Sequence, residues 1–465
     1  VNYPLIISVK KKKPDKGSRA RVTVANTAGD RKSFDILQDE LPMYKNDPKS
    51  PWLLAPEAVV DIYRKIAANS ARLGDLYEVF RGVMTSADNL YLVKPVQCLE
   101  NGLVRVELGD GQQLVVEDYL IHPFIKGKDI GEFSYAAGRH IIFTHDVQSF
   151  EPLWDRDQRL ALSQLGLLGY QLRVRAAGEA IVYALDAQMC RTFSNALRGL
   201  GNLGFVIRRV TPCATTECYE VLKGESQILR VNFDADNCEV YVEGLGIPNA
   251  PRATQHFLAH FNDLIRRDDY RSNLPPWAIF RVSQDKFKDY RIAWQDIAKH
   301  FETCILPVWT SVDICRGRVK RLIVPDHTTY FIIESNKVKA LKLLLYLNSN
   351  LARALLKLWS WTARGGYYRH MAAYVGHLPI PEQLARCSLW RWLEESMGGE
   401  EDLNEAGKRV HEMHAEKLVG ELLSAFGISS EEYRELVEFS RWLNEVAPVK
   451  ETTEELTEEE IEEEE

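Results

Sequence analysis

The sequence lacks the features that mark membrane, secreted and zinc-stabilised proteins. No apolar run reaches the roughly 20 residues that a membrane-spanning helix needs, and the richest, residues 341–359, is interrupted by Asn348, Ser349, Asn350 and Arg353. No secretory signal pattern opens the chain, so we expect a cytoplasmic protein without a membrane partner. The eight cysteines form no Cys-x-x-Cys pair, and we therefore expect reduced thiols and no metal site.

Charge is distributed unevenly along the 465 residues. The formal net charge is −8, but residues 383–465 hold 8 Lys and Arg against 24 Asp and Glu, which leaves residues 1–382 with a surplus of 8 positive charges. A basic body is compatible with a polyanionic partner. The ending "ETTEELTEEEIEEEE" is typical of a solvated, self-repelling tail, which we prefer to a DNA-mimicking or partner-docking role.

Apolar periodicity predicts both helices and short strands along the chain, with an α+β insert and a C-terminal helical tail. "LIISVKKKK" and "RARVTVAN" resemble the two strands of an opening hairpin. Helices are expected over about 55–77, over about 336–362 and, ending at Gly427, in the tail. The expected units are residues 1–35, 36–149 together with 250–382, the insert 150–249, the helical tail 383–449 and the acidic disordered tail 450–465.

Four short motifs invite a catalytic or metal-binding interpretation that their context does not favour. "GLGNLG", residues 199–204, follows a helical pattern and precedes a strand, the reverse of a dinucleotide site, so we expect the end of a helix. "NLPPW", residues 273–277, differs by an inserted leucine from the Asn-Pro-Pro-aromatic motif of amino-methyltransferases, so a Pro-Pro entry into the strand "WAIFRV" is preferred. "HFLAH" and "HEMH" lack a third metal ligand at a suitable spacing.

The stretch "EVFRGVMTSADNLYLVK", residues 78–94, connects two hydrophobic strands through a polar, hydroxyl-rich elbow. A tight hairpin needs only a two-residue turn, whereas the polar spread runs from Met84 to Asn89. This excess length indicates that the elbow has a use besides reversing the chain.

Four pieces taken in order resemble the target-recognition region of TaqI-like N6-adenine DNA methyltransferases and type IIG restriction–modification enzymes. In that family a Gly-x-x-Thr elbow, a Lys-Gly-x-Asp-Ile element, a Leu-Asn-Ser helix and a closing Leu-Pro-Ile-Pro follow one another. The counterparts here are Gly82 with Thr85, residues 126–130, 347–349 and 378–381. The resemblance covers about residues 40–150 and 250–381, while the insert is longer than the usual connection and the acidic tail lies outside it.

The resemblance implies a mixed α/β (α+β) fold, in which helices lie on the twisted, mostly antiparallel sheet of a recognition domain. It also implies double-stranded DNA as a partner and catalysis elsewhere. No catalytic residue is expected in this chain, and S-adenosylmethionine would belong to a methyltransferase domain or subunit placed before residue 1, whose last strands residues 1–35 would be. The residues expected to contact phosphates are Arg81, Lys126, Lys128, Lys286, Lys288, Arg291, Arg364 and Arg369, and those expected to read or stack on bases are Thr85, Ser86, Asp88, Asn89, Tyr367 and Tyr368.

Two other interpretations remain open at the level of sequence. The chain could be a non-catalytic scaffold that docks a protein partner through its acidic helical tail. It could also be a nucleotide-dependent enzyme that uses residues 199–204, which we consider the weakest of the three. Salt-dependent binding of duplex DNA would separate the DNA-recognition interpretation from these two, because phosphate contacts release counterions.

Overall fold

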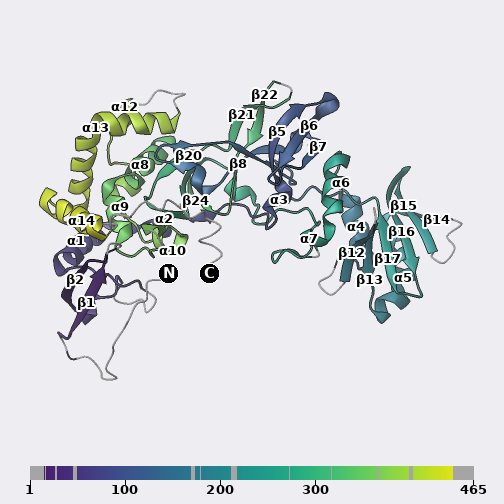
Figure 1. Cartoon of the computed structure of the whole chain (residues 1–465), viewed down its shortest axis with the longest axis horizontal. Coiled ribbons are helices and arrows are strands. Elements are labelled where there is room, and N and C mark those ends of the chain that lie inside the picture. Colours follow the sequence, from purple (N-terminus) through teal and green to yellow (C-terminus); the bar gives the residue numbers. More distant parts are fainter. Residues whose placement is uncertain are drawn as a thin grey trace.

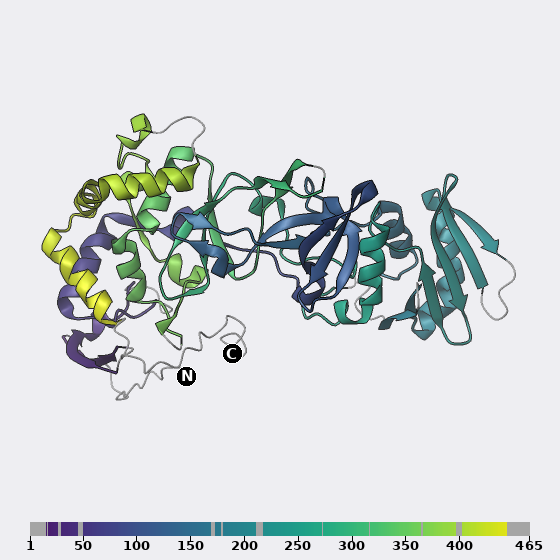
Figure 2. The same ribbon diagram turned by 45° about the horizontal axis from the view of Figure 1, so that its top comes forward.

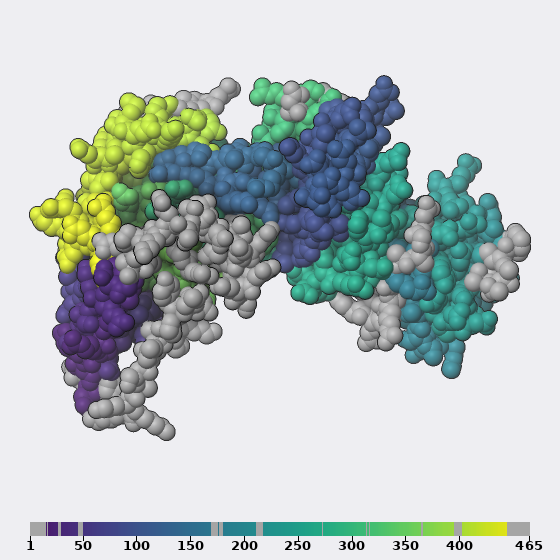
Figure 3. Space-filling view, in the orientation of Figure 1, coloured from purple at the N-terminus to yellow at the C-terminus, as the bar shows by residue number. Residues whose placement is uncertain are grey.

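The computed structural model describes residues 15, 17–26, 29–44, 50–168, 173–177, 180–210, 217–271, 273–315, 317–363, 366–396 and 402–443. The protein is a mixed α/β chain with several mostly antiparallel sheets and C-terminal helices, which confirms the predicted fold class. It is elongated, with a helix-rich lobe at one end and a separate sheet at the other (Figures 1 and 2). Its outline is concave along the lower edge of Figure 3, between the purple strands and the teal ones.

The largest sheet of the central region has the strand order β23-β8-β11-β5-β6-β7. Its neighbours pair antiparallel except β23 and β8, which run parallel. Strand β6 alternates buried and half-buried residues, as expected for a strand with one covered face. Strand β8 is buried along its whole length, as expected for a strand covered on both faces. The strands are β5 (Leu92–Cys98), β6 (Leu103–Leu108), β7 (Gln113–Glu117), β8 (Ile121–Ile125), β11 (Arg139–Ile142) and β23 (Val324–Pro325), and helices α6 (Pro251–Ala259) and α7 (Phe261–Leu264) lie beside them.

A second central sheet, ordered β20-β18-β24-β4, connects this region to the helical lobe. Trp294 and Ile332 of this sheet lie in one hydrophobic core with residues of the lobe, so the two parts share buried apolar surface. The strands are β4 (Phe80–Arg81), β18 (Tyr290–Gln295), β20 (Thr303–Leu306) and β24 (Thr329–Glu334), and the helices of the lobe are α1 (Glu57–Ala68), α8 (Lys337–Leu347), α9 (Asn350–Lys357), α13 (Leu403–Phe426) and α14 (Ser430–Leu443).

The helix expected over 336–362 is broken in two at the Leu-Asn-Ser motif. Asn348 is fully buried; its side-chain amide donates to Thr303 O at 2.9 Å, and its Oδ1 accepts from Thr303 N at 2.8 Å. Ser349 then caps α9, because its hydroxyl accepts from Ala352 N at 3.2 Å. The motif therefore ties the helical lobe to the backbone of β20, an edge strand of its sheet, and the prediction of one continuous helix was wrong.

The tail helices pack on their own protein. Leu418, Leu422 and Phe426 are buried in the core that α1, α8 and α9 also line. Helix α13 ends at Gly427, as predicted, and this glycine has a left-handed conformation. The apolar face of α13 that a docking partner would use is therefore covered, at these three residues, by the protein's own core.

The insert forms a sheet of its own, ordered β12-β13-β17-β16-β15-β14, at the far end of the molecule (Figure 2). The glycine run 199–204 continues and ends α5, with Gly204 in the left-handed conformation, as expected for a helix end. The hairpin β12–β13 was not among the expected elements. The elements are α4 (Arg156–Gln164), β12 (Arg173–Ala177), β13 (Ala180–Ala184), α5 (Ala187–Gly199), β14 (Val206–Val210), β15 (Glu217–Lys223), β16 (Ser226–Asp234) and β17 (Glu239–Glu243).

Small two-stranded sheets complete the fold, and one of them explains the Leu-Pro-Ile-Pro motif: Ile380 of β26 pairs with Ala71 of β3, which docks the motif beside α1. Near the N-terminus β1 pairs with β2, so the described hairpin uses 31–37 as partner of 19–25, and the expected strand over 5–13 lies outside the described residues. The remaining elements are β1 (Arg19–Ala25), β2 (Arg31–Leu37), β3 (Ser70–Arg72), α2 (Leu73–Leu76), α3 (Asp88–Tyr91), β9 (Ile130–Gly131), β10 (Ser134–Tyr135), β19 (Ile297–Ala298), β21 (Trp309–Asp313), β22 (Arg318–Leu322), β25 (Tyr368–Arg369), α10 (Ala372–Val375), β26 (Pro379–Pro381), α11 (Glu382–Ala385) and α12 (Leu393–Ser396).

The cysteines are not all reduced thiols. Cys98 is joined to Cys315 and Cys190 to Cys238, whereas Cys304 and Cys387 are free, so the expectation was wrong for the paired residues. Within the described ranges no group of three His, Cys, Asp or Glu residues is arranged to hold a metal ion. Nor does any described helix combine the length and the apolar character needed to cross a membrane.

Candidate nucleic-acid interface

The polar elbow is a crossover between the two central sheets. Strand β4 before it belongs to the sheet of β18 and β24, whereas β5 after it belongs to the sheet of β8 and β11. Between them the chain forms isolated bridges from Val83 to Asp326 and from Met84 to Phe280, and then turns into α3 near the middle of the molecule (Figure 1). The elbow is long because it must pass from one sheet to another.

Gly82 allows the elbow to approach the loop after β23. A Cβ atom at this position would lie 2.0 Å from Asp326 O and 2.4 Å from Pro325 O, far inside contact distance. The close approach lets Gly82 N donate to Thr329 O at 2.9 Å and Val83 N donate to Pro325 O at 2.8 Å. Any side chain here would separate the two segments.

Thr85 and Asp88 join the elbow to the Lys-Gly-x-Asp-Ile turn. The Thr85 hydroxyl is buried; it donates to Asp88 Oδ1 and accepts from Ala87 N at 3.2 Å. The other Asp88 oxygen, Oδ2, accepts from Lys126 Nζ at 2.8 Å. These contacts make Thr85 and Lys126 supports of the elbow, whereas Ser86, which has a positive φ of 50°, is exposed and Asn89 is exposed as well.

Arg267 also supports the elbow, and sequence reasoning missed it. Its buried guanidinium donates to Thr85 O at 2.6 Å, and Arg267 Nε donates to Leu264 O at 2.9 Å. A third contact runs to the carbonyl of Pro276, in the "NLPPW" stretch. Its position in the charged run "RRDD" looked like an exposed helix end, and no local pattern marks it as buried.

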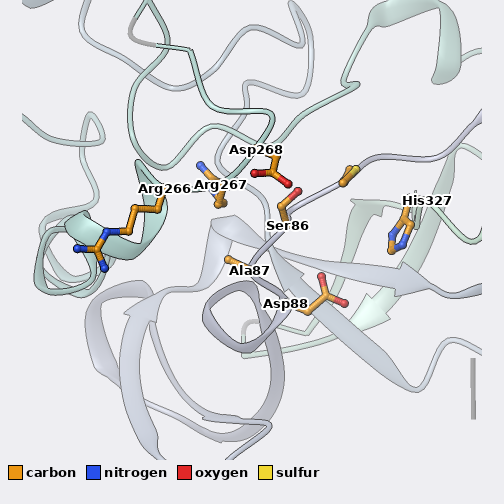
Figure 4. A pocket seen from close by; sticks show the side chains of 8 residues that line it. Ser86, Ala87, Asp88, Arg266, Arg267, Asp268 and His327 are labelled. Atoms are coloured by element: carbon orange, nitrogen blue, oxygen red, sulfur yellow. The ribbon is translucent and has the colours of Figure 1, made fainter. Parts of the chain in front are cut away.

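The elbow, α7 and the 326–329 loop surround a hollow of about 520 Å³ (Figure 4). Ser86 and Asp88 line it from the elbow, Arg266 and Asp268 line it from the end of α7, and His327 faces them from the loop. The hollow thus presents carboxylate acceptors, a hydroxyl, a guanidinium and an imidazole within one space. Such a mixture of donors and acceptors matches the chemistry of base edges, which carry both.

Arg81 and Arg369 flank one buried carboxylate beside this hollow. Arg81 Nη2 lies 3.7 Å and Arg369 Nη2 lies 3.6 Å from Oδ2 of Asp296, which is 2% exposed. Arg81 also donates through Nε to His327 O. The side chain of Arg81 is 30% exposed and that of Arg369 is 11% exposed, so Arg81 keeps the more accessible face.

Several predicted contact residues are occupied or inaccessible. Arg291 is fully buried, its guanidinium donates to Pro307 O at 2.6 Å, and burial lowers its pKa to about 9, so it cannot meet a phosphate in this structure. Tyr368 is 2% exposed, which prevents stacking on a base. Lys286 Nζ donates to Arg81 O at 2.6 Å, and burial lowers its pKa to about 8. These three predicted roles do not fit the observed burial.

The other candidates lie on the surface. Lys288 is exposed and its Nζ lies 2.8 Å from Asp285 Oδ1, so its charge is partly balanced. Lys128 is exposed and makes no ion pair with any described residue, and Tyr367 is half-buried. Arg364 lies outside the described residues. Lys128 and Tyr367 line a second hollow, of about 300 Å³, next to the Lys-Gly-x-Asp-Ile turn.

The remaining motifs have structural roles. Trp277 is buried and its indole N–H donates to Leu153 O at 2.9 Å, so the aromatic of "NLPPW" is not available to an extruded base. The strand expected after the prolines is reduced to the single bridge at Phe280. Of the "HFLAH" pair, His256 Nε2 lies 2.9 Å from Leu90 O, and burial lowers the pKa of this imidazole.

Comparison with solved structures places this chain beside two restriction–modification enzymes. The type IIG restriction endonuclease BpuSI aligns with a TM-score of 0.36 and 10% sequence identity over 89% of this chain and 35% of its own. The type IIL restriction–modification enzyme MmeI, solved in complex with DNA, aligns with a TM-score of 0.31 and 10% identity over 80% of this chain and 37% of its own. The chain therefore spans little more than a third of either enzyme. No protein-family model and no curated protein sequence matches it.

Proposed function

We propose that this chain recognises DNA as part of a site-specific N6-adenine DNA methyltransferase of a restriction–modification system. Methyl transfer is assigned to a separate or preceding domain. One observation carries the proposal: the Asp88–Lys126 ion pair, at 2.8 Å, joins the elbow to the Lys-Gly-x-Asp-Ile turn, the two pieces for which the sequence resemblance implies DNA contact. Both pieces also bond to the 325–329 loop, which assembles one surface from three segments.

The residues proposed to face DNA fall into two groups. Arg81, Lys128 and Lys288 are accessible cations around the elbow, so they are suited to phosphates, with Arg369 behind Arg81. Ser86, Asn89, Asp268 and His327 offer accessible hydroxyl, amide, carboxylate and imidazole groups in or beside the hollow, so they are suited to base edges.

Two described motifs that could suggest a cofactor site or a transferase centre, residues 199–204 and 273–277, lack the geometry for either role. The 199–204 glycine run ends a helix instead of opening one, so it presents no helix N-terminus to a cofactor. The buried Trp277 cannot hold an extruded adenine. Cofactor binding and methyl transfer are therefore both assigned to a partner domain or subunit.

Binding of a fluorescent duplex, measured by anisotropy over a range of salt concentrations, tests the proposal. We expect affinity to fall steeply with salt, with a slope of about −0.9 per neutralised phosphate. Lys128→Ala should weaken binding to every sequence and flatten the slope by about one unit, because Lys128 carries an accessible charge on the proposed surface. Lys408→Ala, an exposed lysine on α13, is the matched control and should change neither value.

A second set of experiments tests sequence recognition and catalysis separately. Asn89→Ala should alter the preferred sequence in a selection from random duplexes, since an amide that reads a base edge discriminates between bases. Methylated adenine should appear only when the catalytic domain or subunit is added. Absence of DNA binding at low salt, with that partner present, would refute the proposal.

A further inference from the structure

The exposed Lys128, in the Lys-Gly-x-Asp-Ile turn, lines one side of the second hollow. It encloses about 300 Å³, and Lys299, His300, Glu302 and Tyr367 line its other sides. The pairing of β19 with β25 sets this arrangement, because it brings the residues after β19 beside those before β25. Lys299 Nζ consequently lies 5.1 Å from the centre of the Tyr367 ring.

Positive charge gathers around this hollow with little balancing acid. Lys299 is exposed and, like Lys128, makes no ion pair with any described residue. Lys357 lies behind it, with Nζ 5.9 Å from the centre of the Tyr368 ring. Glu302 is the one acidic residue among the described residues that line the hollow, against the two lysines Lys128 and Lys299.

Burial and neighbouring positive charges lower the pKa values of two residues of this cluster, Lys357 and His300. Burial lowers the pKa of Lys357 to about 8, and the neighbouring Arg353 adds to the shift. Burial also lowers the pKa of His300, with further contributions from Lys357, Arg353 and Lys299 that outnumber the opposing effect of Glu302. Arg353 is paired with Glu132, whose Oε1 lies 3.0 Å from Arg353 Nη2, whereas Lys128 and Lys299 have no acidic partner among the described residues. Like charges held close together are stabilised when an anion binds between them.

We propose that this hollow binds a phosphodiester group of the DNA backbone, as a phosphate site separate from the elbow. The inference rests on the proposed function and extends it to Lys299, His300 and Lys357. Its position favours DNA over a free nucleotide, because the 126–130 turn serves both hollows: Lys126 faces Asp88 in the first and Lys128 lines the second. A duplex seated on the elbow would continue across this turn.

Anisotropy titrations of Lys299→Gln and Lys299→Arg against a duplex of 20 to 30 base pairs test the site. We expect Lys299→Gln to lower affinity roughly threefold to tenfold near 0.1 M salt and to flatten the salt slope by about 0.9, whereas Lys299→Arg retains both. Lys408→Gln is the matched surface control. Melting temperatures of all variants should agree with the unsubstituted protein, since both lysines are exposed.

The outcomes separate this inference from the proposed function. If the unsubstituted chain binds DNA and Lys299→Gln matches it in affinity and slope, the phosphate site is refuted while the proposed function stands. If the unsubstituted chain does not bind DNA at low salt even with the catalytic partner present, the proposed function fails as well. A rise in melting temperature with sodium tripolyphosphate that Lys299→Gln abolishes, without DNA binding, would assign the hollow to a free polyphosphate and overturn the DNA assignment.

Discussion

The close approach at Gly82 gives a sharp prediction for Gly82→Ala. The new methyl carbon would lie 2.0 Å from Asp326 O, so the elbow and the loop must separate by about 1 Å to reach an allowed contact. That shift breaks the hydrogen bonds from Gly82 N to Thr329 O and from Val83 N to Pro325 O, at about 1 kcal/mol each. Strain from overpacking adds about 1–3 kcal/mol, for a total loss of about 3–5 kcal/mol in the free energy of unfolding.

Urea unfolding and DNA binding together measure this effect. Gly138→Ala is the matched control, because a Cβ atom there meets nothing within 4 Å, and it should change the free energy of unfolding by less than about 0.5 kcal/mol. Where Gly82→Ala remains folded, DNA affinity should fall because Ser86 and Asn89 move with the elbow. A Gly82→Ala protein as stable as Gly138→Ala, with unchanged DNA affinity, would refute the account of the elbow.

Two further predictions concern buried polar groups. Arg267→Met should lower the free energy of unfolding by about 3 kcal/mol, because it removes charged donors from three backbone carbonyls. Arg266→Met, at the exposed neighbour, should lower it by less than about 0.5 kcal/mol. Equal losses in the two variants would contradict the anchoring role of Arg267. Burial lowers the pKa of His122 and His370 to about 3 and of His145 to about 4, so the unfolded chain takes up protons first as pH falls below about 6.5. Stability should therefore drop between pH 7 and pH 5 by about 2 kcal/mol per histidine, a pH dependence that His145→Gln reduces in urea titrations; a flat profile would contradict the burial of these rings.

Features that follow from local residue spacing, or from the order of helices and strands along the chain, could be predicted from the sequence. The helix over α1 and the stop at Gly427 follow from apolar spacing and from glycine chemistry, which are local. The glycine run of the insert could likewise be assigned to a helix end because the elements on either side of it were in the wrong order for a cofactor turn. The elbow was recognised as longer than a hairpin requires, although its two strands proved to belong to different sheets.

Features that depend on distant partners could not be predicted. Arg291 reads locally as a cation at a strand end, but its guanidinium is buried and donates to the carbonyls of Leu306 in β20 and of Pro307. The break at Asn348 depends on the backbone of Thr303, which is 45 residues away in the chain. Thr85 looked like a base-reading hydroxyl, yet its contact with Asp88 and burial under Arg267 turn it inward. Tertiary packing decides each of these roles, and no local pattern carries that information.

Hydrogen exchange with and without DNA tests the central claim most directly. Backbone amides of the elbow, the 126–130 turn and the 326–329 loop should exchange more slowly when a saturating duplex is added at low salt, because these three segments form the proposed surface. Amides of β14–β17 in the insert, at the far end of the molecule, serve as the internal reference. Protection of the three segments with an unchanged insert is the predicted result. Binding of DNA that protects other segments and leaves these three unchanged would contradict the account.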